Sequence, residues 1–484
     1  MSLDPAFLAA LEAIVGRSGI VRDECELTVY ESDGLARLRS MPAVAVLPES
    51  AEAVQQVVCL CHGHGVPFVA RGHGTGLSGG ALPAPEGVLI VLTRLNRVLE
   101  VDVANRRITV EPGVINLDVS RAVAPHGYYY APDPSSQLIC SIGGNVAENS
   151  GGAHCLKYGF TVHHVLGLEA VLPDGEMIHV GGSVLDPPGL DLVGVLVGSE
   201  GTLAVVTKVT LQLLRKPEAV QTLLAAFDST EAAGNTVSDI IAAGIIPAAV
   251  EMMDRLTVQA AEAAVHPNFP EAEAILIVEL DGPQAEVTEL FGPVEARCRD
   301  RGATVVEIAR SEEQRARIWK GRKAAFAAMG RVSPNYYVQD GVIPRTTLPE
   351  VLARIQALER RSGLRIGNVF HAGDGNLHPL VCYDGRVPGQ ADLAQAVAAE
   401  ILTYCLDAGG SITGEHGVGA DKASQMSKMF TPDDLETMQW LRRAFDPDNL
   451  CNPGKVFPTP RLCGEAQGPS RQDSVEAAGL ARPV

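Results

Sequence analysis

The chain has 484 residues, of which 46% are hydrophobic, and a formal net charge of −19 at pH 7. Its length predicts two or three domains, and its acidic charge disfavours a surface that binds nucleic acid or an anionic membrane. No run approaches the ~20 apolar residues of a membrane helix, so we expect a cytoplasmic protein that is peripheral to the inner membrane only through partners.

The first 37 residues form a predicted helical segment, because apolar residues recur at helical spacing from Ala6 to Val15. A strand over 41–48 follows, and then a helix whose N-cap is Ser50. The stretch Cys59-Leu-Cys61-His62-Gly-His64 is either a metal cluster or the end of that helix. Gly63 and Gly65, which follow the apolar-periodic segment 51–61, favour the helix end.

Residues 71–80 form a glycine-rich loop after the strand-like run 66–70, with the sequence Arg-Gly-His-Gly-Thr-Gly-Leu-Ser-Gly-Gly. Glycine lets backbone N–H groups approach an oxyanion, so we interpret the loop as a pyrophosphate cradle; the alternative is a flexible surface loop. A formal Rossmann match at Gly74, Gly76 and Gly79 is rejected, because the prolines that follow the loop prevent the helix which that motif requires.

Two further stretches are rich in glycine and small polar residues, a composition typical of loops whose backbone closely surrounds a ligand. Residues 132–152 combine prolines, glycines and small polar residues, and Gly198-Ser-Glu-Gly-Thr202 is a third such loop. Strands are predicted at 165–172, 177–180 and 203–214.

After Pro217 strands and helices alternate, which predicts a separate α+β cap domain. We expect strands at 219–227 and 274–280 and helices at 230–243 and 284–301. The predicted organisation is therefore an N-terminal segment 1–37, a cofactor-binding domain 38–217, a cap 218–458 and a disordered tail 459–484.

His371 and His378 flank Asp374-Gly375, a favoured two-residue hairpin turn. Counting outward from this turn places the two histidines opposite each other, with Cβ atoms ~5 Å apart. On their own, two such histidines are more often structural than metal ligands.

Glu415 and His416 lie between two glycines, after a predicted helix at 393–407 and a short strand at 411–413. Glu415 completes a two-histidine, one-carboxylate metal set with His371 and His378, and His416 is then a candidate general base. Arg322 lies in a predicted helix, where spacing alone favours a solvated face.

Taken together, these motifs resemble the FAD-linked 2-hydroxy-acid dehydrogenases of the vanillyl-alcohol-oxidase-like flavoproteins over residues 20–458. That family includes the flavin subunit of glycolate oxidase and the D-lactate and D-2-hydroxyglutarate dehydrogenases. The resemblance implies an α+β fold with a PCMH-type two-subdomain FAD-binding domain and an FAD-linked oxidase cap. It implies cofactor contacts along the three loops and the C-terminal return at 452–455, at Arg71, Gly72, Gly74, Thr75, Gly76, Leu77, Ser78, Gly79, Pro132, Asp133, Ser135, Ser136, Ser141, Gly143, Gly144, Asn145, Asn149, Gly152, Glu200, Gly201 and Asn452.

The resemblance further implies oxidation of a small 2-hydroxy acid, with its carboxylate on Arg322, its hydroxyl proton taken by His416 and its hydride passed to FAD. His371, His378 and Glu415 match the ligands of a divalent metal, for which zinc is expected. Electrons then leave to a quinone-linked chain or to a partner subunit with iron–sulfur centres rather than to oxygen.

Two departures from the family pattern refine this expectation. Leu77 stands where covalently flavinylated relatives have histidine, so FAD is expected to be non-covalent. Phe326 and Val338 stand near the places where polar residues hold the second carboxylate of 2-hydroxyglutarate, which favours glycolate or D-lactate. The competing hypotheses are a non-catalytic FAD-binding subunit of an oxidoreductase complex and a metallohydrolase without flavin.

Overall fold

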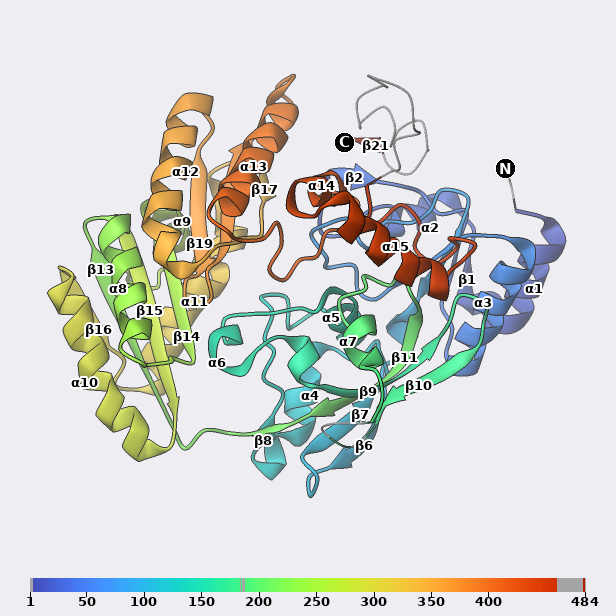
Figure 1. Cartoon of the computed structure of the whole chain (residues 1–484), viewed down its shortest axis with the longest axis horizontal. Coiled ribbons are helices and arrows are strands. Elements are labelled where there is room, and N and C mark those ends of the chain that lie inside the picture. Colours follow the sequence, from blue (N-terminus) through green and yellow to red (C-terminus); the bar gives the residue numbers. More distant parts are fainter. Residues whose placement is uncertain (1–2, 183, 185–187, 459–481, 484) are drawn as a thin grey trace. The chain divides into compact units, whose positions relative to one another are not determined.

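The structure is a computed structural model that describes residues 3–182, 184, 188–458 and 482–483. Its internal contacts divide the chain into two compact units (Figure 1). Unit 1 comprises residues 1–150, 160–215 and 415–484, and unit 2 comprises residues 151–159 and 216–414.

Unit 1 begins with a four-stranded sheet in the order β1-β3-β5-β4, in which β3, β5 and β4 run parallel. These three strands are short apolar runs, as expected for strands covered on both faces. The C-terminal segment returns to this sheet: the Phe68 N–H donates to the Leu450 carbonyl at 2.8 Å, and the Asn452 N–H donates to the Phe68 carbonyl at 2.8 Å.

A five-stranded antiparallel sheet in the order β10-β9-β11-β7-β6 forms the second layer of unit 1. Helix α3 contacts β9 and β11 as well as the apolar core of the first sheet, so it joins the two sheets. The strands of unit 1 are β1 (Ile20–Val21), β2 (Leu38–Arg39), β3 (Val44–Val46), β4 (Phe68–Arg71), β5 (Val88–Val91), β6 (Val98–Asp102), β7 (Arg107–Val110), β8 (Tyr128–Tyr129), β9 (Val165–Val171), β10 (Met177–Gly181), β11 (Val205–Gln212) and β12 (Leu214–Arg215). Its α-helices are α1 (Pro5–Val15), α2 (Glu24–Leu27), α3 (Ala51–His64), α4 (Asn116–Val123), α5 (Ile142–Glu148), α7 (Leu192–Leu196), α14 (Met426–Met429) and α15 (Pro432–Phe445).

Unit 2 is built on one eight-stranded antiparallel sheet in the order β16-β13-β15-β14-β19-β20-β17, with β18 paired to β20. One face is covered by α9 and α11, and the other by α8, α10, α12 and α13 (Figure 1). The strands are β13 (Ala219–Phe227), β14 (Ala249–Asp254), β15 (Ala274–Gly282), β16 (Val305–Ile308), β17 (Asn335–Val338), β18 (Gly341–Val342), β19 (Ile366–His371) and β20 (Asn376–Tyr383). The helices are α6 (Cys155–Tyr158), α8 (Thr230–Ala242), α9 (Arg255–Val265), α10 (Gln284–Asp300), α11 (Glu312–Ala328), α12 (Leu348–Ser362) and α13 (Gln390–Asp407).

Several local predictions are confirmed and others need correction. Ser50 caps α3 by accepting from the Ala53 N–H at 3.2 Å, and α3 ends at His64 before Gly65, whose φ is +63°. The helix-end interpretation of the Cys59–His64 stretch is therefore correct, although Gly63 lies inside the helix and Gly65 alone ends it. The N-terminal segment is not wholly helical, because β1 pairs with β3. No strand forms among the described residues 411–413, where Ser411 makes an isolated bridge to Val342. Of the predicted disordered tail, residues 459–481 and 484 lie outside the described residues.

Candidate active site

Three buried polar side chains share one face of the unit 2 sheet. Glu251 on β14 is the register partner of His371 on β19, and His378 lies on the neighbouring strand β20. Successive strand residues point to opposite faces. Met253, Val369 and Leu380, each two residues from one of these three, pack against α9 and α11. The alternation therefore places all three polar side chains on the face that α11 covers.

The hairpin between the two histidines differs from the prediction. His371 pairs with Asn376 and Val369 pairs with His378, so the connection has four residues rather than two. The Gly375 N–H donates to the His371 carbonyl at 3.2 Å, which closes this longer loop. The histidines are therefore diagonal neighbours. Their rings still meet edge to face, with centroids 5.0 Å apart and an interplanar angle of 88°.

Arg322 lies on the buried stripe of α11, so the solvated helix face expected from spacing is wrong. Its Nε–H donates to Glu251 Oε2 at 2.6 Å, and its NH2 lies 2.5 Å from the same oxygen. The other oxygen of Glu251 lies 2.8 Å from His371 Nδ1. One buried carboxylate therefore joins a predicted substrate residue to a predicted metal ligand.

Asp340 is a buried member of this cluster that the sequence analysis missed. Its Oδ1 lies 3.6 Å from His378 Nε2. Its Oδ2 accepts from the Thr413 hydroxyl at 2.6 Å and from the Gly414 N–H at 3.1 Å. The only sequence signal was Asp340-Gly341, which reads as an ordinary turn.

Glu415 directly follows Gly414 and is the first residue of the returning part of unit 1. Its Oε1 lies 3.6 Å from the Nε2 of His416, the next residue. Continuing along the chain, the Val418 and Gly419 N–H groups each donate to the Glu200 carboxylate at 2.6 Å. The candidate base therefore stands two residues before a backbone segment that is fixed to the third loop of unit 1.

The loops of unit 1 converge as the cradle hypothesis requires. A Cβ on Gly72 would collide with the Ser141 hydroxyl, so the first and second loops touch. The Asn452 side-chain amide donates to the Gly80 carbonyl at 3.0 Å and to the Glu200 carbonyl at 2.7 Å. Asn452 thus links the first loop, the third loop and the C-terminal return.

The donors of the glycine-rich loop fit an anionic cofactor. Arg71 NH1, His73 Nδ1 and the Ser78 hydroxyl are buried and have no hydrogen-bond partner within the described part of the chain. Buried polar groups normally have partners. A pyrophosphate is an acceptor-rich group that would satisfy such donors. The residues present therefore fit FAD.

Two parts of this cradle were not anticipated. The segment 417–419 was missed, although Gly417-Val-Gly419 is a glycine signal of the same kind as the first loop. The other is Asp33-Gly34: a Cβ on Gly34 would lie 2.8 Å from the Gly76 carbonyl oxygen, so the N-terminal segment packs directly against the glycine-rich loop.

Comparison with known proteins finds two family matches, which together cover most of the chain. The family "FAD binding domain" matches residues 42–181, and "FAD linked oxidases, C-terminal domain" matches residues 216–456. Glycolate oxidase subunit GlcD of Escherichia coli K12 is 50% identical over 459 residues, covering 95% of this chain and 92% of that protein. D-lactate dehydrogenase of Anaerostipes hadrus is 30% identical over 93% of this chain and 97% of that protein.

The chain belongs to the FAD-linked 2-hydroxy-acid dehydrogenases. The predicted family and its PCMH-type fold are thereby confirmed. The solved structure of p-cresol methylhydroxylase with substrate bound shares this fold, with a TM-score of 0.80 at 17% identity over 93% of this chain and 96% of that one.

In this dehydrogenase, some of the residues predicted to contact the cofactor form hydrogen bonds with other residues of the protein. Asn145 accepts from the Asn116 amide at 2.9 Å and donates to the Ser150 hydroxyl at 3.2 Å. Asn149, with φ +53°, accepts from the Val162 N–H at 2.9 Å. Gly152 belongs to unit 2 rather than to the cradle unit. Their contacts to FAD, like those of Pro132, Asp133, Ser135, Ser136, Gly143, Gly144 and Gly201, stay predictions.

Phe326 supplies an apolar boundary to the histidine cluster. Its ring centroid lies 5.8 Å from that of His378 and 6.0 Å from the Arg322 guanidinium carbon. Val338 is nearby in the sheet, where it pairs with Leu380 on β20. Neither side chain can donate a hydrogen bond to a second substrate carboxylate.

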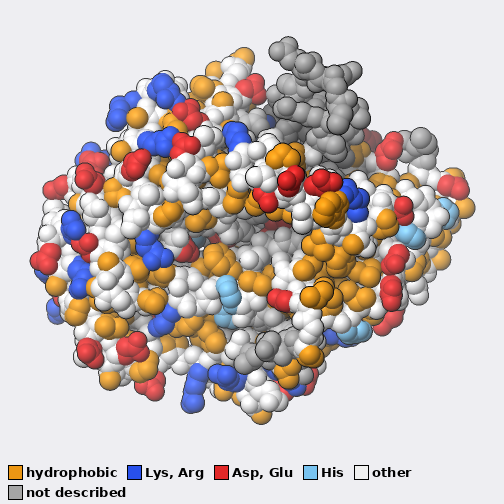
Figure 2. Space-filling model, in the orientation of Figure 1, with side chains coloured by type: hydrophobic (Ala, Val, Ile, Leu, Met, Phe, Trp, Pro, Cys, Tyr) orange, Lys and Arg blue, Asp and Glu red, His pale blue; other side chains and the backbone are white. Residues whose placement is uncertain are grey.

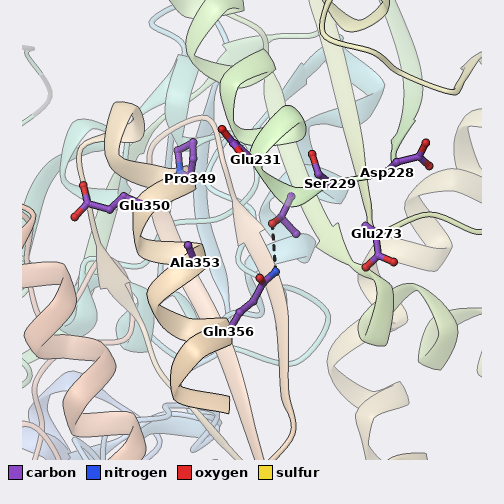
Figure 3. A pocket seen from close by; sticks show the side chains of 9 residues that line it. Asp228, Ser229, Glu231, Glu273, Pro349, Glu350, Ala353 and Gln356 are labelled. Carbon is purple, nitrogen blue, oxygen red and sulfur yellow. Dashed lines mark hydrogen bonds between the residues drawn. The ribbon is translucent and has the colours of Figure 1, made fainter. Parts of the chain in front are cut away.

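A cavity of about 520 Å³ lies elsewhere in unit 2, by α8 and α12 (Figure 3). The Gln356 amide donates to the Thr230 hydroxyl at 3.4 Å, and a dashed line from Gln356 marks this bond in Figure 3. Four carboxylates line the cavity, from Asp228, Glu231, Glu273 and Glu350. Like charges repel, so this cavity is a poor site for an anionic hydroxy acid.

Acidic and basic side chains are interspersed on the face shown in Figure 2. Among the residues that the structure places, no helix combines the length and the hydrophobicity that a bilayer crossing requires.

Proposed function

We propose that this chain oxidises glycolate or D-lactate to the 2-oxo acid, using FAD and a divalent metal, and passes the electrons to an acceptor other than oxygen. The observation that carries the proposal is the buried cluster of Arg322, His371 and His378 on one face of the unit 2 sheet. It supplies a carboxylate-binding cation beside two imidazoles that suit a metal.

Arg322 would bind the substrate carboxylate. Glu251 engages the Nε edge of its guanidinium through a single oxygen, and a guanidinium carries five N–H donors in a planar fork. Donors therefore remain for a second carboxylate. Phe326 beside Arg322 limits the room and the polarity for a longer diacid, which supports a small monocarboxylate.

His371, His378 and Glu415 would hold the metal, for which zinc is expected from two imidazoles and one carboxylate. A metal bound there would act as a Lewis acid toward the substrate hydroxyl, while FAD would serve as hydride acceptor. The diagonal placement of the two histidine rings suits a shared ion.

His416 would remove the hydroxyl proton. Three residues separate Gly414, whose N–H is fixed to Asp340, from Val418, whose N–H is fixed to Glu200. Four residue steps of chain span at most about 14 Å. His416 is therefore two residues from Gly414, which Asp340 fixes, and two residues from Val418, which Glu200 fixes.

Partner subunits are expected, because the relatives from Escherichia coli and Bacillus subtilis are named as subunits of glycolate oxidase. We propose a quinone-linked chain or an iron–sulfur partner as acceptor. The same proposal includes zinc as the metal ion. It also includes a cytoplasmic location and attachment to the inner membrane through partner subunits. The similarity to glycolate oxidase and D-lactate dehydrogenase disfavours the alternative of a non-catalytic FAD-binding subunit.

The test is a panel of glycolate, D-lactate, L-lactate and D-2-hydroxyglutarate assayed with an artificial dye acceptor and with oxygen. We expect dye reduction with glycolate or D-lactate, weak reduction with the diacid and little peroxide. Dye reduction absent with every acid would favour the non-catalytic alternative. Rapid stoichiometric peroxide formation would contradict the proposed acceptor.

The same assay separates the roles of two adjacent residues. His416→Ala should lower the rate by roughly 10²–10⁴ and keep the metal, because a positioned base is lost while the ligands stay. Glu415→Gln should lose metal. Metal analysis showing the reverse pattern would exchange the two roles.

A further inference from the structure

We infer that Glu251 is a positioning residue that orients the predicted metal ligand His371 and the predicted substrate residue Arg322 at the same time. The inference rests on the proposed function, because it concerns how those two residues are prepared. Glu251 is not among the site residues predicted from the sequence. It lies on β14, directly opposite His371 on β19, and its side chain is inaccessible to solvent.

Glu251 determines the tautomer of His371. An ionised carboxylate only accepts hydrogen bonds, so His371 Nδ1, 2.8 Å from Glu251 Oε1, must carry the proton. A neutral imidazole then has its lone pair on Nε2. Glu251 thus leaves Nε2 as the metal-binding atom, in the carboxylate–histidine–metal pattern that fixes ring orientation and raises ligand basicity.

Glu251 also compensates the buried positive charge of Arg322. Its guanidinium is buried on α11, and a buried cation is costly unless it is paired. Glu251 Oε2 accepts a hydrogen bond from Arg322 Nε–H at 2.6 Å, and this ion pair fixes one edge of the guanidinium. Glu251 therefore gives one carboxylate oxygen to Arg322 and the other to His371, so it orients both side chains at once.

Unit 2 contains a close counterpart that serves as a control. Glu279 on the adjacent strand β15 is also buried, and it accepts from Arg315 Nε at 2.8 Å and from Trp319 Nε1 at 2.7 Å. The Nε2 of His154, which is not a predicted ligand, lies 3.5 Å from Glu279 Oε1. Glu279→Gln removes the same charge from the same sheet without touching the histidine pair.

The experiment measures zinc affinity on FAD-containing protein that has been stripped of metal, by competition with a fluorescent chelator. Glu251→Gln is isosteric and should weaken zinc binding by about 10–100-fold, the usual effect of removing a carboxylate that supports a histidine ligand. Glu279→Gln should stay within about threefold of wild type. Glu251→Asp is one methylene too short to reach both partners and should also weaken zinc binding, so the inference stays testable if Glu251→Gln is recovered poorly folded.

Steady-state kinetics separate positioning from a general loss of structure. With D-lactate or glycolate at saturating zinc, Glu251→Gln should regain much of its kcat and keep a raised KM, because Arg322 has lost its ion pair. Zinc affinity equal to wild type in both Glu251 variants would overturn the inference. Wild-type protein that binds no zinc would instead overturn the metal assignment of the proposed function, so the two failures are distinguishable.

Discussion

Asp33 is a buried carboxyl under the glycine-rich loop, where it accepts from the Leu35 N–H at 2.8 Å. Burial raises its pKa to about 6, although Leu35, Arg71 and the Gly79 N–H favour the ionised form. A folded pKa above the unfolded value of about 3.9 means that folding favours the protonated acid. The stability from this group is therefore fully present below pH 4 and is lost as the pH rises through 6.

Asp33→Asn should accordingly change the pH dependence of stability in FAD-free protein. We expect the free energy of unfolding of the variant, relative to wild type, to rise by on the order of 1–2 kcal/mol between pH 5 and pH 7.5. Urea unfolding at the two pH values measures this difference. If the difference in the free energy of unfolding between variant and wild type does not vary with pH, Asp33 keeps an ordinary pKa.

The limits of sequence reasoning are clearest for the two buried glutamates. Glu251 and Glu279 each interrupt an apolar strand, and such an interruption predicts a buried charge with a partner. It does not tell which partner, because that depends on strand order. β14 lies beside β19, so Glu251 meets a site histidine, whereas Glu279 on β15 meets Arg315 and Trp319.

At the scale of elements, long periodic segments were predicted well. The strand at 219–227 is reproduced to the residue, and the helices predicted at 230–243 and 284–301 each end one residue early. Alternation and helical spacing are local properties, so the sequence contains them. The hairpin at 372–375 was predicted wrongly because its register depends on which backbone groups close the loop, and Gly375 bonds to His371 instead of forming the tight two-residue turn.

The segment 417–419 offers a prediction about the cofactor cradle. Gly417 has φ +80°, and an added Cβ would collide with the Glu148 carboxylate and lie 2.9 Å from Glu200 Oε1. Displacing Glu200 would break its bonds to the Val418 and Gly419 N–H groups. We therefore expect Gly417→Ala to weaken FAD binding at least tenfold, as measured by titrating FAD into flavin-free protein.

Gly409 provides the matched control, because its φ is +82° and a Cβ there would meet nothing within 4 Å. Both alanine variants carry the left-handed backbone cost of roughly 1–2 kcal/mol, but only Gly417→Ala adds a collision. Equal FAD affinity in the two variants would mean that the backbone at 417–419 does not shape the cradle.

For the whole molecule, the order of motifs along the chain predicted the family and both kinds of site. The fold was predictable because each domain has its own pattern: glycine-rich loops among short strands, then alternating strands and longer helices. What could not be predicted is the route of the chain. Residues 151–159 leave the cofactor part to join unit 2, and the return to unit 1 begins at residue 415, well before the segment 452–455 that the resemblance implied. Such exchanges depend on tertiary contacts, for example those of Lys157 and Tyr158 with Asp281.

This division of the chain predicts that metal and flavin can be removed separately. The loops of the cradle, the C-terminal return and Asn452 lie in unit 1. Two of the three proposed metal ligands, His371 and His378, lie in unit 2, where Glu251 supports His371, and the third, Glu415, begins the return to unit 1. Treatment with a chelator should therefore abolish dye reduction and leave the flavin absorbance near 450 nm, and added zinc should restore the rate. Acid precipitation should then release the flavin, since Leu77 offers no attachment atom.

Each outcome of that experiment bears on a different part of the argument. Loss of flavin together with metal would mean that flavin binding depends on the metal site. That result would contradict the expectation that the cradle in unit 1 binds FAD without help from His371 and His378 in unit 2. Full activity in metal-free protein would leave His371 and His378 without a catalytic ion. Flavin retained by the acid-precipitated chain would require a covalent link at a residue other than Leu77. Because absorbance, metal content and rate are measured on one sample, the three results cannot be mistaken for one another.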